Sequence, residues 1–239
     1  MILENNSLKL KGNLGRLTTL EEVSYEMYEM VFHLGSEHRI EGTKFDLEIQ
    51  IYYQSVTPGH IKNSAALSIL FKIFPGATNL FFDNDINLLD LPDRLEPVKS
   101  IVGDIDLSHL FMQNERDAFV EFSYYEYEGS ITAPPCREDT TWYIVSDILP
   151  ISYTTIETIK DSVYSLNDEC LSDLLLMSEN VVETPLLENI RNIQPINQRK
   201  IFYYESPIKK DKVKCKKKNI LCNFIKSEKY ENLRKLTFK

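Results

Sequence analysis

The sequence lacks long hydrophobic runs and any segment that marks a protein for export. Its longest apolar candidate covers residues 65–74 and already contains Lys72, whereas a helix that crosses a bilayer needs about 20 apolar residues in a row. Glu4 stands where a secretory signal peptide would carry its apolar segment. We therefore expect neither a transmembrane helix nor a signal peptide in this chain, and these absences favour an intracellular protein.

Cysteine is scarce and shows no pattern. The four cysteines stand at positions 136, 170, 215 and 222. No two of them form the C-x-x-C spacing that is typical of zinc sites and redox centres. The distribution favours free thiols in a reducing compartment over a zinc site.

Charge is distributed unevenly along the 239 residues. The chain has 36 acidic and 27 basic side chains, but residues 208–239 hold 12 of the basic and only 3 of the acidic ones. Residues 1–207 therefore carry 33 acidic against 15 basic side chains. Because 43% of the residues are hydrophobic and no internal repeat is present, we predict one folded domain over residues 1–207 and a basic tail over residues 208–239.

The tail begins with a dense basic run, residues 209–218, which extends from Lys209 to Lys218. Such a run is typical of a solvated segment, and it also suits an anionic partner such as nucleic acid, an acidic protein or an anionic membrane surface. No aromatic residues alternate with the lysines, so nucleic acid is the weakest of these candidates. Apolar residues in the segment 220–238 are spaced for an amphipathic helix that docks onto another surface.

Hydrophobic periodicity predicts a domain built mainly of strands. The predicted strands cover residues 23–33, 45–53, 66–74, 119–125, 141–147 and 200–204. In the second strand Phe45, Leu47, Ile49 and Ile51 share one face, and Asp46, Glu48, Gln50 and Tyr52 share the other. A glycine-bearing turn within residues 39–44 joins the first two strands, and helical spacing is clearest over residues 154–177.

Two of the chain's four histidines, His33 and His38, lie within residues 29–38 (EMVFHLGSEH). A zinc-dependent hydratase holds its metal with three neutral imidazoles and leaves the fourth position open for a water whose pKa the metal lowers. Two imidazoles come readily from one strand, because positions i and i+2 share a face. Residues 29–38 resemble the motif of the α-type carbonic anhydrases, whose general form is Q-F-H-F-H followed by S-E-H.

Further segments resemble the same family in the same order. Residues 44–53 (KFDLEIQIYY) are similar to K-x-x-x-E-x-H-x-V-H, residues 129–136 (GSITAPPC) with 142–145 (WYIV) to G-S-L-T-T-P-P and W-I-V, and residues 191–199 (RNIQPINQR) to R-P-x-Q-P-L-N-x-R. The resemblance implies a mainly β fold, with a large, twisted, mostly antiparallel sheet and short peripheral helices. It also implies that the N-terminal segment of the family is missing here, which would leave a sheet edge or groove exposed.

The zinc-ligand positions of this motif fall on Val31, His33 and Gln50. Valine has no lone pair to offer, and an amide oxygen is a poor ligand for zinc, which prefers nitrogen and sulfur donors. The resemblance assigns Glu48 to a supporting role beside the third ligand and His38 to a structural role, so neither replaces a lost imidazole. We therefore predict no bound metal and no other cofactor.

The resemblance also identifies Glu37 and Thr132 as the pair that orients the zinc-bound hydroxide in the family. We expect this pair to be a remnant without a catalytic role, because buried polar groups need hydrogen-bond partners whether or not a metal is present. The same reasoning makes His33 a satisfied histidine of the core.

The substrate side of the motif has changed as well. Tyr52 stands where the family lines its CO2 pocket with a small apolar side chain, so we expect its ring to fill that space. Ile131 and Trp142 keep the apolar wall of the pocket. Ala133 replaces the second threonine of the family's T-T pair.

Together these features predict a carbonic anhydrase-related protein without hydratase activity, which acts as a protein-binding or scaffold subunit with an unidentified partner or in a larger assembly. One alternative is a divergent hydratase that binds zinc through His33, Glu48 and a ligand that the motif does not predict. Another is that residues 208–239 anchor an otherwise inert body to an anionic partner.

Overall fold

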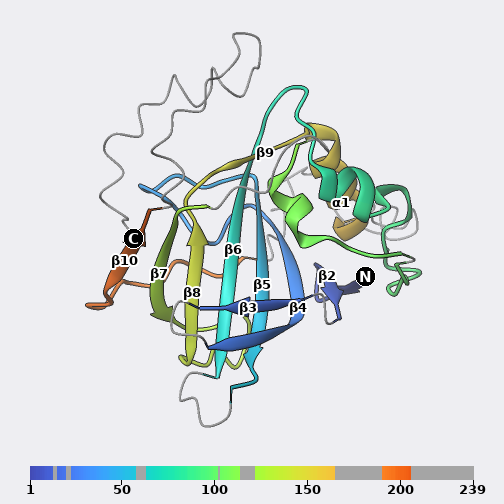
Figure 1. Ribbon diagram of the computed structural model, residues 1–239. Coiled ribbons are helices and arrows are strands. Elements are labelled where there is room, and N and C mark those ends of the chain that lie inside the picture. Colours follow the sequence, from blue (N-terminus) through green and yellow to red (C-terminus); the bar gives the residue numbers. More distant parts are fainter. Residues whose placement is uncertain are drawn as a thin grey trace, which may run out of the picture.

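The computed structural model describes residues 1–12, 15–19, 23–57, 63–101, 103–113, 122–164 and 190–205. These residues form one large sheet with a few short helices beside it (Figure 1). The strands are β1 (Ile2–Glu4), β2 (Ser7–Lys11), β3 (Arg16–Thr18), β4 (Ser24–Leu34), β5 (Leu47–Ser55), β6 (Ser64–Ile73), β7 (Tyr124–Gly129), β8 (Thr140–Val145), β9 (Leu149–Ile151) and β10 (Ile201–Tyr204). The helices are η1 (Phe81–Asp85), η2 (Leu88–Asp90), η3 (Leu107–Phe111) and α1 (Tyr153–Tyr164).

The strands lie side by side in the order β1-β2-β4-β5-β6-β8-β7-β10, with β3 paired to β4 and β9 paired to β6. The pairs β6–β8 and β6–β9 are parallel, and the other pairs are antiparallel. The mainly β fold and the mostly antiparallel sheet that the sequence predicts are therefore confirmed. Within the ranges given above, no helix has the length and apolar character needed to span a bilayer.

Five of the predicted strands agree with β4, β5, β6, β8 and β10 to within two residues at each end. The strand predicted from residue 119 begins only at Tyr124, and residues 119–121 lie outside the described residues. The helix predicted to residue 177 is described as far as Tyr164, and its remainder also lies outside. β1, β2, β3 and β9 were not predicted from the sequence; each has three to five residues, which leaves little length for an alternating pattern.

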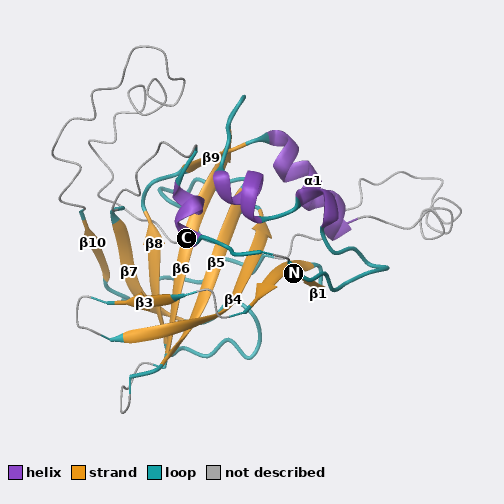
Figure 2. Ribbon diagram, turned by 45° about the vertical axis from the view of Figure 1, so that its right-hand side comes forward, coloured by secondary structure: helices purple, strands orange, loops and turns teal. Residues whose placement is uncertain are grey.

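Apolar side chains cover both faces of the sheet. Leu47, Ile49 and Ile51 of β5 belong to the larger core, on the side where η1, η3 and α1 gather (Figure 2). A smaller apolar group, here called the site-face cluster, consists of Val31, Ile40, Phe45, Tyr52, Ala66, Leu70, Tyr125, Tyr127, Trp142 and Ile144. The prediction that Phe45 shares a face with Leu47 is wrong, because β5 begins at Leu47 and strand alternation does not extend to the residues before it.

A tight turn lies in the connection between β4 and β5. Glu41 and Gly42 have φ angles of 52° and 80°, and the Thr43 amide donates to the Ile40 carbonyl oxygen at 2.9 Å. Two successive residues with positive φ define a turn that suits antiparallel strands, and glycine adopts this backbone at no steric cost. The predicted glycine-bearing turn is confirmed.

A buried and an exposed leucine allow the contribution of core packing to stability to be compared with that of a surface side chain. Leu47 is fully buried in the larger core, whereas Leu89 is 98% exposed. We expect Leu47→Ala to lower the free energy of unfolding by about 2–5 kcal/mol, because it removes buried methyl groups and leaves a cavity. Leu89→Ala should change it by less than about 0.5 kcal/mol. Urea unfolding followed by circular dichroism measures both, and equal losses would contradict the packing described here.

Candidate functional site

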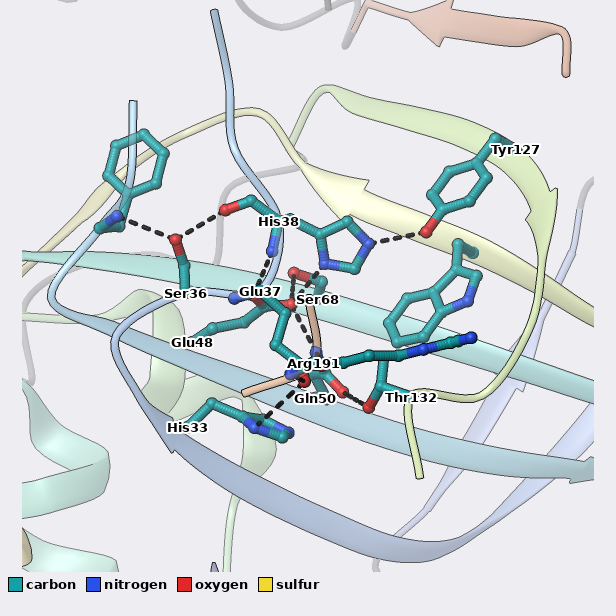
Figure 3. Close-up of polar contacts among 12 residues, drawn as sticks. His33, Ser36, Glu37, His38, Glu48, Gln50, Ser68, Tyr127, Thr132 and Arg191 are labelled. Carbon is teal, nitrogen blue, oxygen red and sulfur yellow. Dashed lines mark hydrogen bonds and ion pairs between the residues drawn. The ribbon is translucent and has the colours of Figure 1, made fainter. Parts of the chain in front are cut away.

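The candidate site lies on one face of the sheet, where β4 and β5 run side by side. Val31 of β4 lies directly opposite Gln50 of β5, and His33 lies directly opposite Glu48. Residues that face each other in an antiparallel pair project to the same side. The structure therefore brings together the three positions that the motif assigns to zinc and the predicted supporting glutamate. Figure 3 shows His33, Glu48 and Gln50 in this arrangement.

Gln50 is the centre of this arrangement and is fully buried. Its amide nitrogen donates to Glu37 Oε2 at 2.8 Å and to Glu48 Oε1 at 2.9 Å. Its amide oxygen accepts from the Tyr52 hydroxyl at 2.5 Å and from Thr132 Oγ1 at 3.3 Å. A primary amide has two N–H groups and two lone pairs, so these four contacts occupy its full capacity for hydrogen bonds.

Glu48 is also fully buried and accepts hydrogen bonds on both carboxylate oxygens. Oε2 accepts from the backbone amides of Glu37 and His38 at 2.8 and 2.9 Å, and Oε1 accepts from His38 Nδ1 at 2.6 Å and from Ser68 Oγ at 2.8 Å. Burial by itself raises the pKa of the Glu48 carboxyl, but the charge of His38 and these hydrogen bonds outweigh it and lower the pKa to about 2. Glu48 is therefore ionised.

His38 forms the other half of a buried ion pair. Burial lowers the pKa of its imidazole, whereas the Glu48 carboxylate raises it, and the net effect is a raised pKa. His38 Nε2 lies 2.7 Å from the Tyr127 hydroxyl. The imidazole also packs edge-on against the Trp142 ring at 4.8 Å. The structural role that the resemblance implies for His38 is thus realised as a link between Glu48 and Tyr127.

Glu37 and Thr132, the predicted hydroxide-orienting pair, are both bonded to the Gln50 amide. Glu37 Oε1 accepts from the Arg191 backbone amide at 2.5 Å and lies 3.9 Å from His33 Nδ1. The Gln50 side chain thus connects the two members of the pair from the position where the family places a metal ligand.

The position expected to line a CO2 pocket is occupied by an aromatic ring. Tyr52 is buried in the site-face cluster together with Val31, and its ring packs edge-on against Trp142 at 5.9 Å. Burial raises the pKa of the Tyr52 phenol, so its hydroxyl stays protonated and donates to Gln50. Ile131 packs against the same cluster, whereas Ala133 is exposed in the loop that follows β7.

Several residues of this site were not identified from the sequence. Arg191 ties the segment 190–200 to the site, since its guanidinium donates to Ser130 Oγ at 2.9 Å and its backbone amide binds Glu37. Tyr28 lies at an irregularity in the β4–β5 register and packs at 6.3 Å from Tyr52. Ser68 could have been identified from the sequence, because it is a polar residue within an otherwise apolar strand (AALSILF). Arg191 begins the segment RNIQPINQR, whose resemblance to the family motif gave no indication of its contact with the site, and no local pattern marks Tyr28.

Some predictions fall outside the described residues. The basic run 209–218, with its suggested anionic partner, lies there, as do three of the four cysteines, Cys170, Cys215 and Cys222. What the sequence indicates for them remains a prediction. Cys136 is a partly buried free thiol. Among the described residues, no three His, Cys, Asp or Glu side chains are grouped so that they could share a metal ion.

A large mixed sheet with a polar centre between two long antiparallel strands defines a carbonic anhydrase-like protein. The family profile described as "Eukaryotic-type carbonic anhydrase" matches residues 3–205, and the chain belongs to this family. Its curated relatives include dioscorin DB3S of Dioscorea polystachya, which is 29% identical over 83% of this chain and 62% of its own length. Alpha carbonic anhydrase 8 of Arabidopsis thaliana is 28% identical over 87% of this chain and 46% of its own length.

Solved structures show the same fold. A structure of dioscorin complexed with ascorbate has a TM-score of 0.58 and 25% identity, over 86% of this chain and 73% of that chain. The α-carbonic anhydrase of Thermovibrio ammonificans in complex with sulfanilamide has a TM-score of 0.61 and 22% identity, over 84% of this chain and 73% of that chain. The chain spans 57–62% of the length of the three dioscorins that it matches in sequence.

The buried ion pair generates a prediction about acid stability. Because the pKa of Glu48 is lowered in the folded state, its ionised form stabilises the protein above the ordinary carboxyl pKa of 4.5, and this contribution is lost as the pH falls toward 2. We expect Glu48→Gln to lower the free energy of unfolding by about 3–5 kcal/mol at pH 7, because it leaves His38 buried without its counter-charge.

The difference between wild type and Glu48→Gln should shrink as the pH is lowered from 4.5 to 2. Glu26→Gln is the matched control, since Glu26 pairs with Arg16 at the surface and should contribute less than about 1 kcal/mol. Thermal unfolding at a series of pH values measures both variants. A difference for Glu48→Gln that does not change with pH would show that Glu48 is not ionised in the folded protein.

Proposed function

We propose that this chain is a carbonic anhydrase family protein without CO2 hydratase activity, and that it acts as a protein-binding or scaffold subunit. The observation that carries the first part is the Gln50 amide, whose four hydrogen bonds join Glu37, Glu48, Tyr52 and Thr132. A hydratase of this family type needs three imidazoles around a zinc ion that keeps an open position for water. The three motif positions here supply only one imidazole, that of His33.

The residues present do not fit a zinc ion. Val31 has no donor atom and packs in the site-face cluster. The lone pairs of the Gln50 amide oxygen are used by two hydroxyl groups. His33 is then the single nitrogen donor of the three motif positions, and one imidazole does not hold zinc in a protein site.

The alternative of a divergent zinc site is less well supported. It requires Glu48 as a ligand beside His33, but Glu48 already accepts from Glu37, His38, Gln50 and Ser68. Metal binding there would remove donors from a buried carboxylate and leave them without acceptors, which costs several kcal/mol. The network thus favours a site that is complete without metal.

The substrate side supports the same proposal. A hydratase needs an open apolar space beside its zinc-bound water. Here the Tyr52 ring is buried in the site-face cluster and packs edge-on against Trp142. Its hydroxyl binds Gln50, so the ring is anchored at both ends. Moving it to admit CO2 would break that hydrogen bond and its contact with Trp142.

The binding role is proposed on the grounds that the fold is kept while the catalytic positions are not. The polar network fixes the loops around the site with hydrogen bonds alone, so they form a stable surface without a cofactor. A protein or a larger assembly is the proposed partner, and the basic run 209–218 would add an anionic partner.

Zinc content tests the first part of the proposal. After dialysis against excess zinc and removal of loosely bound ions, we expect the wild-type chain to retain far less than one zinc per molecule by elemental mass spectrometry, and to show no CO2 hydration above background. One zinc per chain, lost again in His33→Ala, would overturn the proposal in favour of the divergent hydratase.

Rebuilding the motif provides a positive control. Val31→His with Gln50→His places three imidazoles on one face and should bind one zinc, whereas Gln50→His alone should not, because two nitrogen donors are too few. The double variant should still hydrate CO2 poorly, and adding Tyr52→Val should raise that rate by opening the pocket. No gain from Tyr52→Val in a zinc-loaded variant would contradict the role assigned to the Tyr52 ring.

A further inference from the structure

β10 is the last strand of the sheet on the side opposite β1. Within the described residues it pairs only with β7, in a register from Ile201 opposite Tyr127 to Tyr204 opposite Tyr124. Among the described residues no strand pairs with its other side, so β10 forms an edge of the sheet, at the left of Figure 1. The backbone N–H and C=O groups along such an edge are a template on which another strand can add.

The side chains of this edge strand are aromatic and exposed. Phe202 and Tyr203 are each 51% exposed, and Tyr204 is 37% exposed. Tyr204 stacks on Tyr124 with ring centroids 5.0 Å apart, and Tyr203 packs at 4.9 Å from Tyr125. These contacts hold the rings in place, so little side-chain freedom would be lost on binding. β10 also has none of the lysines or prolines that protect edge strands from pairing.

We propose that β10 pairs with β10 of a second copy of this chain, antiparallel and about a twofold axis at Tyr203. In this register Tyr203 lies opposite the partner's Tyr203, and Phe202 lies opposite the partner's Tyr204. Opposite residues of an antiparallel pair project to the same face, so each face of the joined sheet gains aromatic pairs. Such cross-strand pairs are among those that stabilise sheets. A twofold axis makes the same short strand complementary to itself.

The charges at the two ends of β10 favour this partner and this direction. Arg199 precedes the strand. Its positive charge is close enough to Tyr127, which lies opposite Ile201, to favour ionisation of the phenol, although burial raises the pKa of Tyr127 overall. Glu205 follows the strand. In the antiparallel register Glu205 of one copy lies opposite Ile201 of the other and diagonal to Arg199, within reach of a long side chain. A parallel arrangement in register would instead bring like charges together.

The size of the surface sets the expected affinity. From the area that an aromatic side chain typically buries, the exposed parts of Phe202, Tyr203 and Tyr204 amount to roughly 200–350 Å² per copy. A stable interface buries about 800 Å² per partner. The dimer is therefore weak, with a dissociation constant in the micromolar range or above, and it forms as the protein concentration rises.

This inference rests on the proposed binding role, because it names a second copy of the chain as one binding partner. Dimer formation and zinc content are measured independently, so failure of one is distinguishable from failure of the other. A zinc-free chain that stays monomeric would overturn the dimer and leave the loss of hydratase activity standing.

Sedimentation velocity of the full chain from about 1 to about 200 micromolar tests the association. We expect a shift from monomer toward dimer for the wild type. Tyr203→Lys should abolish it, because two like charges would lie directly opposite each other on the axis. Tyr153→Lys is the matched control, since Tyr153 is 61% exposed on α1, away from β10 in sequence. This variant should dimerise as the wild type does. A wild-type monomer at every concentration overturns the proposal.

Cysteine cross-linking tests the register even if a lysine variant folds poorly. Opposite residues of an antiparallel pair have Cα atoms about 4.5–5.5 Å apart, which suits a disulfide. Under mild oxidation Tyr203→Cys should link to itself between two copies, whereas Tyr204→Cys should not, because it lies opposite Phe202. Peptide mapping by mass spectrometry identifies the bond. A bond from residue 203 to Cys215 or Cys222 of the same chain would show that the chain's own C-terminal segment covers this edge, which overturns the proposal.

Discussion

The carboxylate of Glu48 lies at the centre of the sheet with no exposure to solvent, and an ionised group in such a place is stable only if donors surround it. Its donors come from the connection between β4 and β5, from Gln50 on β5 and from Ser68 on β6. His38 adds the opposite charge. The requirement to satisfy this one carboxylate thus fixes a loop and two strands relative to one another.

Gln50 occupies the position where the family motif places a zinc-binding histidine. A histidine that held zinc at this position would use one nitrogen for the metal and the other for a supporting carboxylate. The amide instead binds two carboxylates and two hydroxyl groups by itself. Tyr52 and Val31 are consistent with this arrangement, since one supplies a hydroxyl to the amide and both fill apolar space beside it. The changes support one another, which is expected of a sequence that specifies a single structure.

The same network reaches the edge of the sheet. The Arg191 backbone amide binds Glu37, and its guanidinium binds Ser130, so the segment 190–200 is attached to the site before it leads into β10. The segment that precedes the aromatic edge strand β10 is therefore held in position by hydrogen bonds to the polar network. The hydrogen bonds that hold this segment, from Arg191 to Glu37 and Ser130, form without a metal ion.

The sequence by itself determined the family, the mainly β fold, the positions of the long strands and the two altered ligand positions, Val31 and Gln50. Alternating periodicity over β4, β5 and β6 and the spacing of the motifs are local properties, so they can be read without a structure. Only the tertiary structure decided that Gln50 stands between Glu37 and Thr132, that Phe45 joins the site-face cluster and that Arg191 reaches the site. These contacts join residues that are far apart in the chain or lie outside regular strands. Their partners are set by how strands and loops pack in three dimensions, which no local pattern records.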